Sequence, residues 1–461
     1  MLSLRTSSPE IDRAFAIALD DLALNIHPYC DGLLAREVPV FLAGESYDTP
    51  WTRDAAINVW NGGGLLYPDV AKNTLLSVLE RRDGELRIGG EYWDAVVWAP
   101  GAWSLYLATG DRDFLALALE ATRNSLAHFE RTEFDAELGL FRGAAVYGDG
   151  ISAYPDAYAD AGHHNIMGWR DLTPVALAVP GEGLPMHALS TNCAYVHAYD
   201  LAGAMAAELG VPADRAWAAR ASSLRKAIDR HFWLPERGHY RYLIDLRGDP
   251  DVQEGFGHAF AILFGVAGAE QRESILRMQH VTPAGLPCLW PPFARYRREG
   301  HVGRHSGTVW PPIQAFWAEA AARGRRADLV GHELAALARH AVRDGQFFEL
   351  YHPETGLPYG GLQERAGAGV ELWEPVAHQT WSATGFLRIV LAAVLGMRLA
   401  PDGIRFEPLL PPGLDELELT GLPYRASTID VRIVRGAAAD SEPPFLPADA
   451  DGQHRIELTA G

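Results

Sequence analysis

Helical segments separated by long polar and aromatic connections run through most of this chain. Between about residues 9 and 397, alanine-rich apolar stretches recur with helical spacing, and the connections are rich in Gly, Pro, Asp and aromatic residues. The helical stretches are 11–26, 68–80, 97–109, 112–129, 192–209, 212–231, 308–322, 327–342 and 379–395. Most of them fall into pairs, so the pattern predicts an all-α region built from helical hairpins.

The hairpins share no strict sequence period, which argues against a short-repeat solenoid. A closed ring of hairpins needs no such identity, and roughly six hairpins fit the segments. We therefore expect residues 1–398 to form an (α/α)6 catalytic toroid. The long connections of such a ring would gather at one end and build the functional site there.

After residue 399 the pattern changes to that of β-strands. Apolar and polar residues alternate at 404–411, 417–419 and 427–434, between Pro and Gly residues. We expect residues 399–461 to form a short β-strand extension and a tail. The tail, proline-rich and polar from about residue 437, ends in a strand or is poorly ordered.

Composition argues against several classes of partner. A formal net charge of -19 disfavours nucleic acid and anionic membranes, and no apolar run approaches the roughly 18 residues of a membrane helix. Cys30, Cys193 and Cys288 are far apart and lack metal-ligand spacing, so we expect free thiols, no metal and no cofactor. The N-terminus lacks the apolar run of a signal peptide, which favours a cytoplasmic protein.

The segment 47–54 contains the first candidate binding residues, Tyr47, Asp48, Trp51, Arg53 and Asp54. An adjacent Arg and Asp can hold two neighbouring sugar hydroxyls, because the guanidinium donates hydrogen bonds and the carboxylate accepts them. The alternative is an Asp at a helix N-cap beside a surface Arg.

A second acidic and aromatic segment contains Trp93 and Asp94. A carboxylate between aromatic rings suits a sugar platform with one hydroxyl acceptor. The alternative is a helix N-terminus with core aromatics.

Asp171 follows Trp169 and Arg170 in the middle of the chain. An acid that protonates a glycosidic oxygen must keep its proton near neutral pH, and an apolar wall such as an indole favours the protonated form. Asp171 is therefore our candidate general acid, and an ordinary loop Asp is the alternative. The adjacent His163 and His164 have no third ligand at a suitable spacing, which disfavours a metal.

Glu349 lies in a second acidic segment, 347–356, and is our candidate general base. A base must sit opposite the acid with room for a water molecule. Glu354, in a Pro-Glu-Thr-Gly turn where exposure is expected, is the competing residue. Further candidates for the sugar pocket are His305, Trp310, Tyr351, His378, Gln379 and Trp381.

Taken in order, Trp-Thr-Arg-Asp at 51–54, Trp-Arg-Asp at 169–171, His-Ser-Gly-Thr-Val-Trp-Pro at 305–311, Glu-Leu-Tyr at 349–351 and His-Gln-Thr-Trp-Ser-Ala at 378–383 resemble the six-hairpin glycosidases. The resemblance covers roughly residues 40–395. It is to the amylo-alpha-1,6-glucosidase part of glycogen-debranching enzymes and to the family of processing glucosidase I and mannosylglycerate hydrolase. The segment 51–54 is also similar to the one by which glucoamylase-type enzymes hold the terminal glucosyl unit.

The resemblance implies an inverting glycoside hydrolase that cleaves a terminal, alpha-linked glucosyl-type sugar, with Asp171 as acid and Glu349 as base. The chain departs from trehalase-like members by Arg170 between Trp169 and Asp171, and it lacks the extra domains of debranching enzymes. Two alternatives stay open. One is a glycoside phosphorylase on the same fold, and the other is a sugar epimerase or sugar-binding toroid that relies on His163, His258, His305 or His378.

Overall fold

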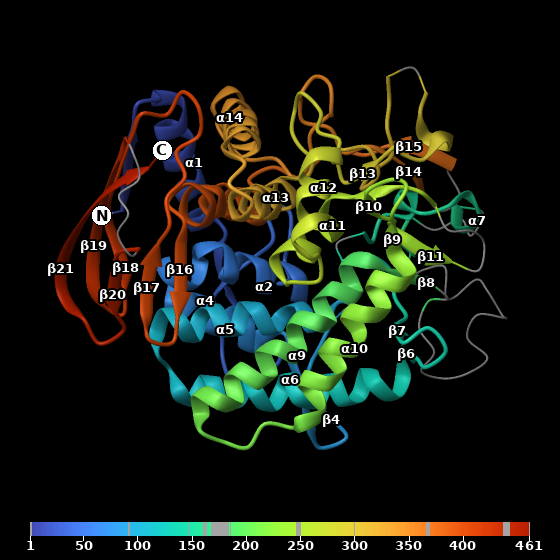
Figure 1. The fold of residues 1–461 in the computed structure, drawn as a ribbon, viewed down its shortest axis with the longest axis horizontal. Helices are drawn as coiled ribbons and strands as arrows, with labels where there is room; N and C mark the ends of the chain where they lie inside the picture. The colour runs from blue at the N-terminus through green and yellow to red at the C-terminus, as the bar shows by residue number, and fades with distance from the viewer. Residues whose placement is uncertain are drawn as a thin grey trace.

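Helices are the main regular elements of the first 394 residues in the computed structural model, and strands form most of the rest (Figure 1). The structure describes residues 2–90, 93–146, 148–159, 164–166, 184, 186–245, 250–298, 300–365, 369–436 and 443–460. The main helices are α1 (Pro9–Leu24), α2 (Thr52–Asn58), α4 (Pro68–Ser77), α5 (Trp98–Thr109), α6 (Arg112–Thr132), α9 (Leu189–Leu209), α10 (Arg215–Phe232), α11 (Gly255–Leu263), α12 (Ala269–Met278), α13 (Pro311–Arg323), α14 (Ala327–Asp344) and α15 (Thr380–Arg388). Short helices are α3 (Gly64–Leu66) and α7 (Asp156–Ala159). Two π-helical segments, Val59–Gly63 and Ile389–Val394, continue α2 and α15.

Six of these helices contact one another in a closed succession. The order of contact is α2, α5, α9, α11, α13 and α15, and α15 returns to α2. Other helices pack against the outside of this succession: α1 contacts α15, α6 and α10 contact α9, and α14 contacts α13. This arrangement fits the expected ring of helical hairpins.

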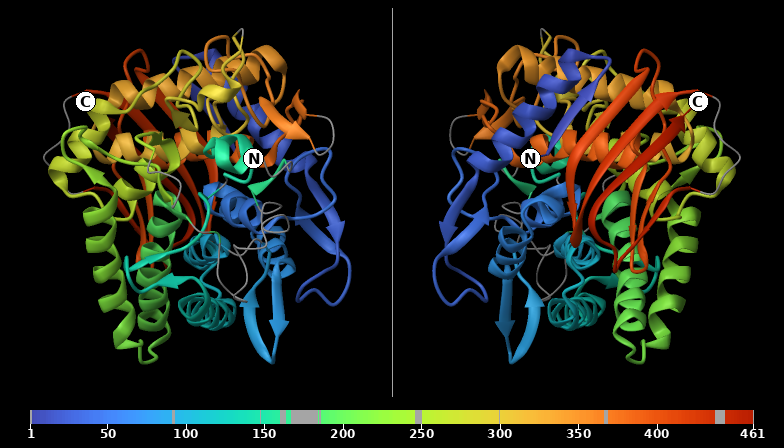
Figure 2. Two further views of the ribbon diagram at one scale, coloured as in Figure 1. Left: turned by 90° about the vertical axis from the view of Figure 1, so that its right-hand side faces the viewer. Right: turned by 90° about the vertical axis from the view of Figure 1, so that its left-hand side faces the viewer.

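The C-terminal strands form a β layer, as the alternating pattern predicts (Figure 2). Its four-stranded sheet has the order β1 (Ser3–Thr6), β18 (Glu416–Tyr424), β19 (Ala426–Arg435) and β21 (Asp451–Ala460). A three-stranded sheet contains β16 (Met397–Ala400), β17 (Gly403–Phe406) and β20 (Phe445–Pro447). The N-terminal strand therefore belongs to the C-terminal sheet, a pairing that the local sequence pattern does not predict.

Short antiparallel ribbons occupy several helix connections, where the pattern predicted loops. They pair β2 (Ile26–Tyr29) with β3 (Val38–Phe41), β4 (Leu79–Arg82) with β5 (Glu85–Ile88), β6 (Phe134–Asp135) with β7 (Leu140–Phe141), β8 (Met186–Ala188) with β11 (Leu243–Asp245), β9 (Trp233–Leu234) with β10 (His239–Tyr240), β12 (Gln253–Glu254) with β13 (Leu289–Trp290), and β14 (Leu362–Arg365) with β15 (Gly369–Leu372). Strands of two to four residues are too short for a period-two pattern to mark them.

Within the described part of the chain, no helix is both long and apolar enough to cross a bilayer. The same residues contain no group of three or more His, Cys, Asp or Glu side chains that could hold a metal ion. Cys193 and Cys288 are buried and Cys30 is exposed, all three as free thiols.

Candidate active site

A cavity of about 440 Å³ lies at the end of the helical region where α2, α13 and α15 begin. Arg53 lies in the first turn of α2, and Trp310 directly precedes α13. Trp381 lies in the first turn of α15. The described residues that line this cavity are Tyr47, Trp51, Arg53, Asp54, Gly90, Asp149, Gly150, His164, Asn165, Arg304, His305, Trp310, Glu349, Gln363, Trp373 and Trp381.

Glu349 is held in the cavity by contacts from two other segments of the chain. Its side chain is almost fully buried, and the Nη2 atom of Arg304 donates to its Oε1 at 2.6 Å. The backbone N–H of Val376 lies 3.4 Å from its Oε2, and the two backbones are joined by Glu349 N–H donating to Val376 O at 2.9 Å. Arg304 is itself oriented, since its Nη1 donates to the carbonyl of Gly360 at 3.1 Å. These charge-assisted contacts keep the carboxylate in one orientation within the cavity.

Arg53 connects two carboxylates. Its Nε lies 3.3 Å from Oδ2 of Asp94, which is fully buried, and its Nη2 lies 3.4 Å from Oδ2 of Asp149. Asp94 thus neutralises and orients the guanidinium from behind, while Asp149 and Arg53 both line the cavity.

Asp149 also contacts His305. The Nδ1 atom of His305 lies 3.1 Å from Oδ1 of Asp149 and 3.1 Å from the backbone nitrogen of Gly150. Nδ1 donates to Asp149 when protonated and accepts from Gly150 when it is not. A Cβ at residue 150 would lie 2.7 Å from that Nδ1, so this close approach requires glycine. The His305 ring stacks on Trp310 with centroids 4.4 Å apart and an interplanar angle of 3°.

The ionisation states of the side chains in the cavity determine which of them donate and which accept hydrogen bonds. Burial opposes the charge of Asp149, but Arg53 and His305 outweigh this effect and hold the pKa of Asp149 well below its usual range. Burial lowers the pKa of His305, which leaves the imidazole neutral near pH 7. Burial and the charges of Glu349 and Asp54 raise the pKa of Tyr47, which stays a neutral phenol. Asp149 is therefore an acceptor of hydrogen bonds, not an acid that can supply a proton.

Tryptophan side chains form the apolar part of the cavity. Trp310 and Trp381 meet edge to face with centroids 4.9 Å apart, and Trp51 is 44% exposed. The Arg304 guanidinium carbon lies 5.8 Å from the ring centroid of Trp373. Indole faces beside polar groups suit the stacking of a sugar ring whose hydroxyls make hydrogen bonds.

Comparison with known proteins assigns the family. The sequence profile of the mannosylglycerate hydrolase MGH1-like glycoside hydrolase domain matches residues 55–382, more than half of the chain. The chain belongs to this glycoside hydrolase family. The match confirms the expected relationship to six-hairpin glycosidases. Residues 397–439 match the C-terminal domain of glycosyl hydrolase family 65, and no curated protein matches the chain in sequence.

Solved structures share the fold at low sequence identity. The GH63 mannosylglycerate hydrolase from Thermus thermophilus in complex with glucose is 16% identical with a TM-score of 0.61, and the match covers 82% of this chain and 100% of that one. A sialidase is 14% identical (TM-score 0.65), over 92% of this chain and 37% of its own. The GH78 rhamnosidase of Bacillus sp. GL1 is 19% identical (TM-score 0.58), over 99% of this chain and 44% of its own. The chain thus spans less than half the length of the last two proteins.

Eight of the predicted site residues line the cavity, namely Tyr47, Trp51, Arg53, Asp54, His305, Trp310, Glu349 and Trp381. Asp171, Trp169 and Arg170 lie outside the described residues, so their roles stay predictions. The competing base, Glu354, is exposed and is not among the described residues that line the cavity.

The other predicted residues lie near the cavity without lining it in the described structure. Trp93 is fully buried and donates through Nε1 to the carbonyl of Ala145 at 3.1 Å, and Asp94 acts through Arg53. The hydroxyl oxygen of Tyr351, also buried, accepts from the Phe348 N–H at 2.9 Å.

His378, Gln379 and Asp48 complete the set of predicted residues outside the lining. Nδ1 of His378 contacts Oδ1 of Asp21 at 2.7 Å. Gln379 is fully buried and Asp48 is exposed.

Eight described lining residues were not among the predicted site residues: Gly90, Asp149, Gly150, His164, Asn165, Arg304, Gln363 and Trp373. Asp149 stands between two glycines in a loop, a pattern that suits close backbone approach and could have been noticed. Arg304 immediately precedes the predicted His305. Gln363 carries no distinctive local pattern, and its position depends on the pairing of β14 with β15.

Proposed function

We propose that this chain hydrolyses a terminal, alpha-linked glucosyl-type sugar from an oligosaccharide or glycoside, with inversion at the anomeric carbon. The observation that carries the proposal is the cavity that contains Glu349, oriented by Arg304, together with Arg53, Asp54 and tryptophan side chains. The family and the similar structure with bound glucose support a sugar substrate. We also infer that the closed succession of helix contacts is an (α/α)6 toroid.

In the proposed reaction, Glu349 removes a proton from a water molecule as its oxygen bonds to the anomeric carbon. Asp171 gives its proton to the glycosidic oxygen as the bond between that oxygen and the anomeric carbon breaks. Attack and departure occur on opposite faces of the sugar, which inverts the configuration. The products are the free sugar and the protonated leaving group, and the two carboxyl groups exchange their protonation states.

The assignment of the acid to Asp171 follows from the resemblance and from the properties of Asp149. Because Arg53 and His305 keep the pKa of Asp149 low, its carboxylate suits a sugar hydroxyl better than a leaving oxygen. Arg53 and Asp54 are the proposed partners of neighbouring hydroxyls, and Tyr47 is a further donor. A separation of about 6.5 to 9.5 Å between the two catalytic carboxyl groups is expected for inversion.

The decisive experiment is a screen of the purified protein against alpha-linked disaccharides and glycosyl glycerates, with proton NMR of the first-formed sugar. Release of the β-anomer from an alpha-linked substrate supports inversion, and initial release of the α-anomer contradicts it. A requirement for inorganic phosphate would identify a phosphorylase instead. Conversion of a sugar without release of an aglycone would identify an epimerase.

A further inference from the structure

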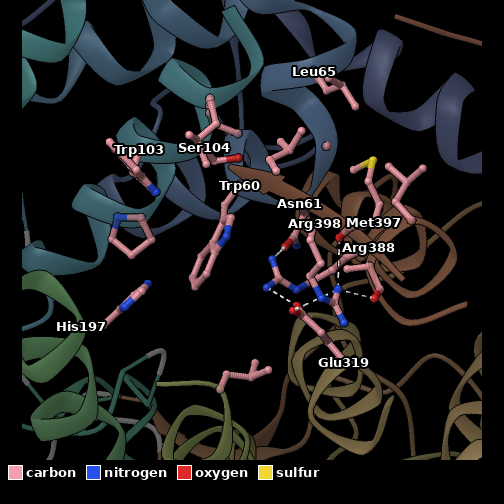
Figure 3. Close-up of a pocket in the computed structure, with 18 of the residues that line it drawn as sticks. Trp60, Asn61, Leu65, Trp103, Ser104, His197, Glu319, Arg388, Met397 and Arg398 are labelled. Atoms are coloured by element: carbon pink, nitrogen blue, oxygen red, sulfur yellow. Dashed lines mark hydrogen bonds and ion pairs between the residues drawn. The ribbon is translucent and has the colours of Figure 1, made fainter. Parts of the chain in front are cut away.

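A second cavity, of about 260 Å³, lies at the opposite ends of the same helices (Figure 3). Arg323 ends α13 and Arg388 ends α15, whereas the first cavity lies where these helices begin. Trp60 follows the end of α2, and Leu263 ends α11. The thirteen residues of α13 span about 20 Å, so the two cavities are separate sites.

Three arginines surround one glutamate in this second cavity. Glu319 contacts Arg388 Nη2 at 2.5 Å through Oε2, and Arg323 Nη2 at 3.4 Å and Arg398 Nη1 at 3.7 Å through Oε1. Glu319 is the sole acidic side chain among the described residues that line the cavity. Glu407, 4.0 Å from Arg398 Nε, is 52% exposed and lies outside that lining. The lining thus carries more positive than negative charge, although the chain as a whole has a net charge of -19.

Part of this positive charge interacts with backbone carbonyl groups near the helix ends. Arg398 donates through Nη1 to the carbonyls of Ala392 at 2.7 Å and Met397 at 3.1 Å. The C-terminus of a helix carries a partial charge of about -0.5, so the helix ends beside the cavity offset part of the excess positive charge. Arg388 also donates through Nη1 to Oδ1 of Asn61 at 3.1 Å.

The arginines of the cluster repel one another while each is attracted to Glu319. Burial opposes the charge of Glu319, but the three arginines outweigh it and lower the pKa of Glu319 to about 2. Burial lowers the pKa of Arg388, and repulsion from Arg398 and Arg323 adds to this effect while Glu319 opposes it. Nε of Arg388 is buried and has no hydrogen-bond partner among the described residues. A bound anion would relieve the repulsion between these guanidinium groups.

Apart from Asn61 and Ser104, the rest of the described lining is mainly apolar and aromatic. The ring centroid of Trp60 lies 4.5 Å from the Arg388 guanidinium carbon. The Trp60 ring also stacks with His197, with ring centroids 6.0 Å apart. Burial lowers the pKa of His197 to about 3, so this ring adds no charge. Trp103 and Met397 also line the cavity. Figure 3 shows Arg388 and Arg398 beside Glu319, with Trp103 and His197 on the other side of Trp60.

We propose that this cavity binds a small organic anion, with a carboxylate or phosphate group on the arginine cluster and a ring or apolar body against Trp60 and Trp103. Guanidinium groups match the geometry of both kinds of oxyanion, and indole faces favour a flat or apolar body. The site is independent of the catalytic proposal, because it shares no lining residue with the first cavity in the described structure.

The test uses benzoate and inorganic phosphate as probes, with benzyl alcohol as the uncharged match for benzoate. Binding to the whole chain is followed by tryptophan fluorescence and isothermal titration calorimetry. We expect saturable binding of benzoate, weaker binding of phosphate and no binding of benzyl alcohol. Absence of saturation by either anion, or equal binding of benzyl alcohol, would overturn the proposal.

Variants locate the site. Arg323→Gln and Arg398→Gln should each weaken benzoate binding by at least about fivefold, in line with the loss of one charge-assisted contact. Arg325→Gln is the matched control, since it removes one exposed charge two residues from Arg323 and outside the described lining. It should change the affinity less than about twofold, and a loss equal to that of Arg323→Gln would contradict the assignment.

The Glu319→Gln variant tests whether the positive charge of the cavity drives benzoate binding. Removal of the one acidic side chain among the described lining residues should strengthen benzoate binding and increase the rise in melting temperature that benzoate causes. Weaker binding in a variant that circular dichroism shows to be folded would contradict the proposed electrostatics. Glu349→Gln should leave benzoate binding unchanged, because Glu349 lies in the other cavity.

Discussion

Glu349 is positioned by residues that are distant in sequence. Arg304 reaches it from the segment before α13, and Val376 reaches it from the segment before α15. A carboxylate held in this way loses little orientational freedom when it meets a water molecule, which is what a general base needs. The same carboxylate without these partners would be an ordinary buried acid.

Replacement of Glu349 by Gln should lower kcat by at least about a hundredfold, because the amide cannot accept the proton of the attacking water. Steady-state kinetics on the substrate identified by the NMR screen measures the effect. Glu354→Gln is the control, since Glu354 is exposed on a turn. A large loss in Glu354→Gln with near-normal turnover in Glu349→Gln would reverse the assignment of the base.

Asp149→Asn should lower kcat/KM by about ten- to a hundredfold, because a hydrogen bond to a charged group contributes about 1.5 to 3 kcal/mol. The pKa of Asp149 is held below its usual range, so the wild-type carboxylate is ionised at neutral pH and above. The loss should therefore be nearly constant between about pH 5 and 8. Asp83→Asn, at an exposed turn, should have no effect, and a loss confined to the acidic side would show that Asp149 titrates in this range.

At the scale of elements, three helices begin beside the first cavity. Thr52, Pro311 and Thr380 open α2, α13 and α15, and the residues just before or after them line the cavity. The helical stretches expected from periodicity are all present, with ends shifted by a few residues, as for 112–129 and α6. α11 lacked a periodic signal because its apolar side chains lie on all sides, and it is buried among α9 and α13.

Glu254 connects the starts of α9 and α11 and should make stability depend on pH. Its Oε2 accepts the backbone N–H of Ser190 at 3.1 Å, and burial raises its pKa to about 8. A folded-state pKa above the unfolded one means that the folded protein holds the proton more tightly. The contribution of Glu254 to stability is therefore complete below about pH 4.5 and is lost as the pH rises to about 8.

Glu254→Gln should remove this dependence. Between about pH 5 and 8, the wild-type free energy of unfolding should fall by up to about 1.4 kcal/mol per pH unit more than that of the variant. Urea denaturation at several pH values measures the difference, with Glu270→Gln on the exposed side of α12 as control. Parallel pH profiles for wild type and Glu254→Gln would show that Glu254 is not the titrating group.

At the scale of the whole molecule, the two ends of the chain meet in one sheet. β1 pairs with β18 from Ser3 opposite Thr420 to Thr6 opposite Leu417, and Leu4 is 8% exposed against the core. α1 follows β1 in the chain and packs against α14 and α15. The N-terminal segment thereby joins the β layer to the helices.

Leu4→Ala should lower the free energy of unfolding by about 2 to 3 kcal/mol, since it removes a buried side chain at the edge of the core. Arg5→Ala is the matched neighbour. Its side chain is 75% exposed and pairs with Glu418 on the surface, so its loss should cost less than about 1 kcal/mol. Chemical denaturation of both variants provides the comparison, and equal losses would mean that β1 does not contribute through Leu4.

The sequence by itself determined the helical and strand regions, the glycosidase resemblance and most of the aromatic and charged residues of the first cavity. Periodicity and motif order are properties of the linear sequence, so they can be recognised without knowing which segments contact one another in the fold. Tertiary structure alone decided that Asp149 joins Arg53 and His305, that Arg304 holds Glu349, and that β1 pairs with β18.

The arginine cluster around Glu319 is likewise a product of tertiary structure that the sequence alone does not reveal. Arg323, Arg388 and Arg398 are unremarkable as isolated residues near helix ends, where cations are common. Their excess charge exists because the last residues of α13 and α15 and the first residues of β16 lie beside one another around a single carboxylate. Charge interactions depend on distance in space, and the fold sets that distance.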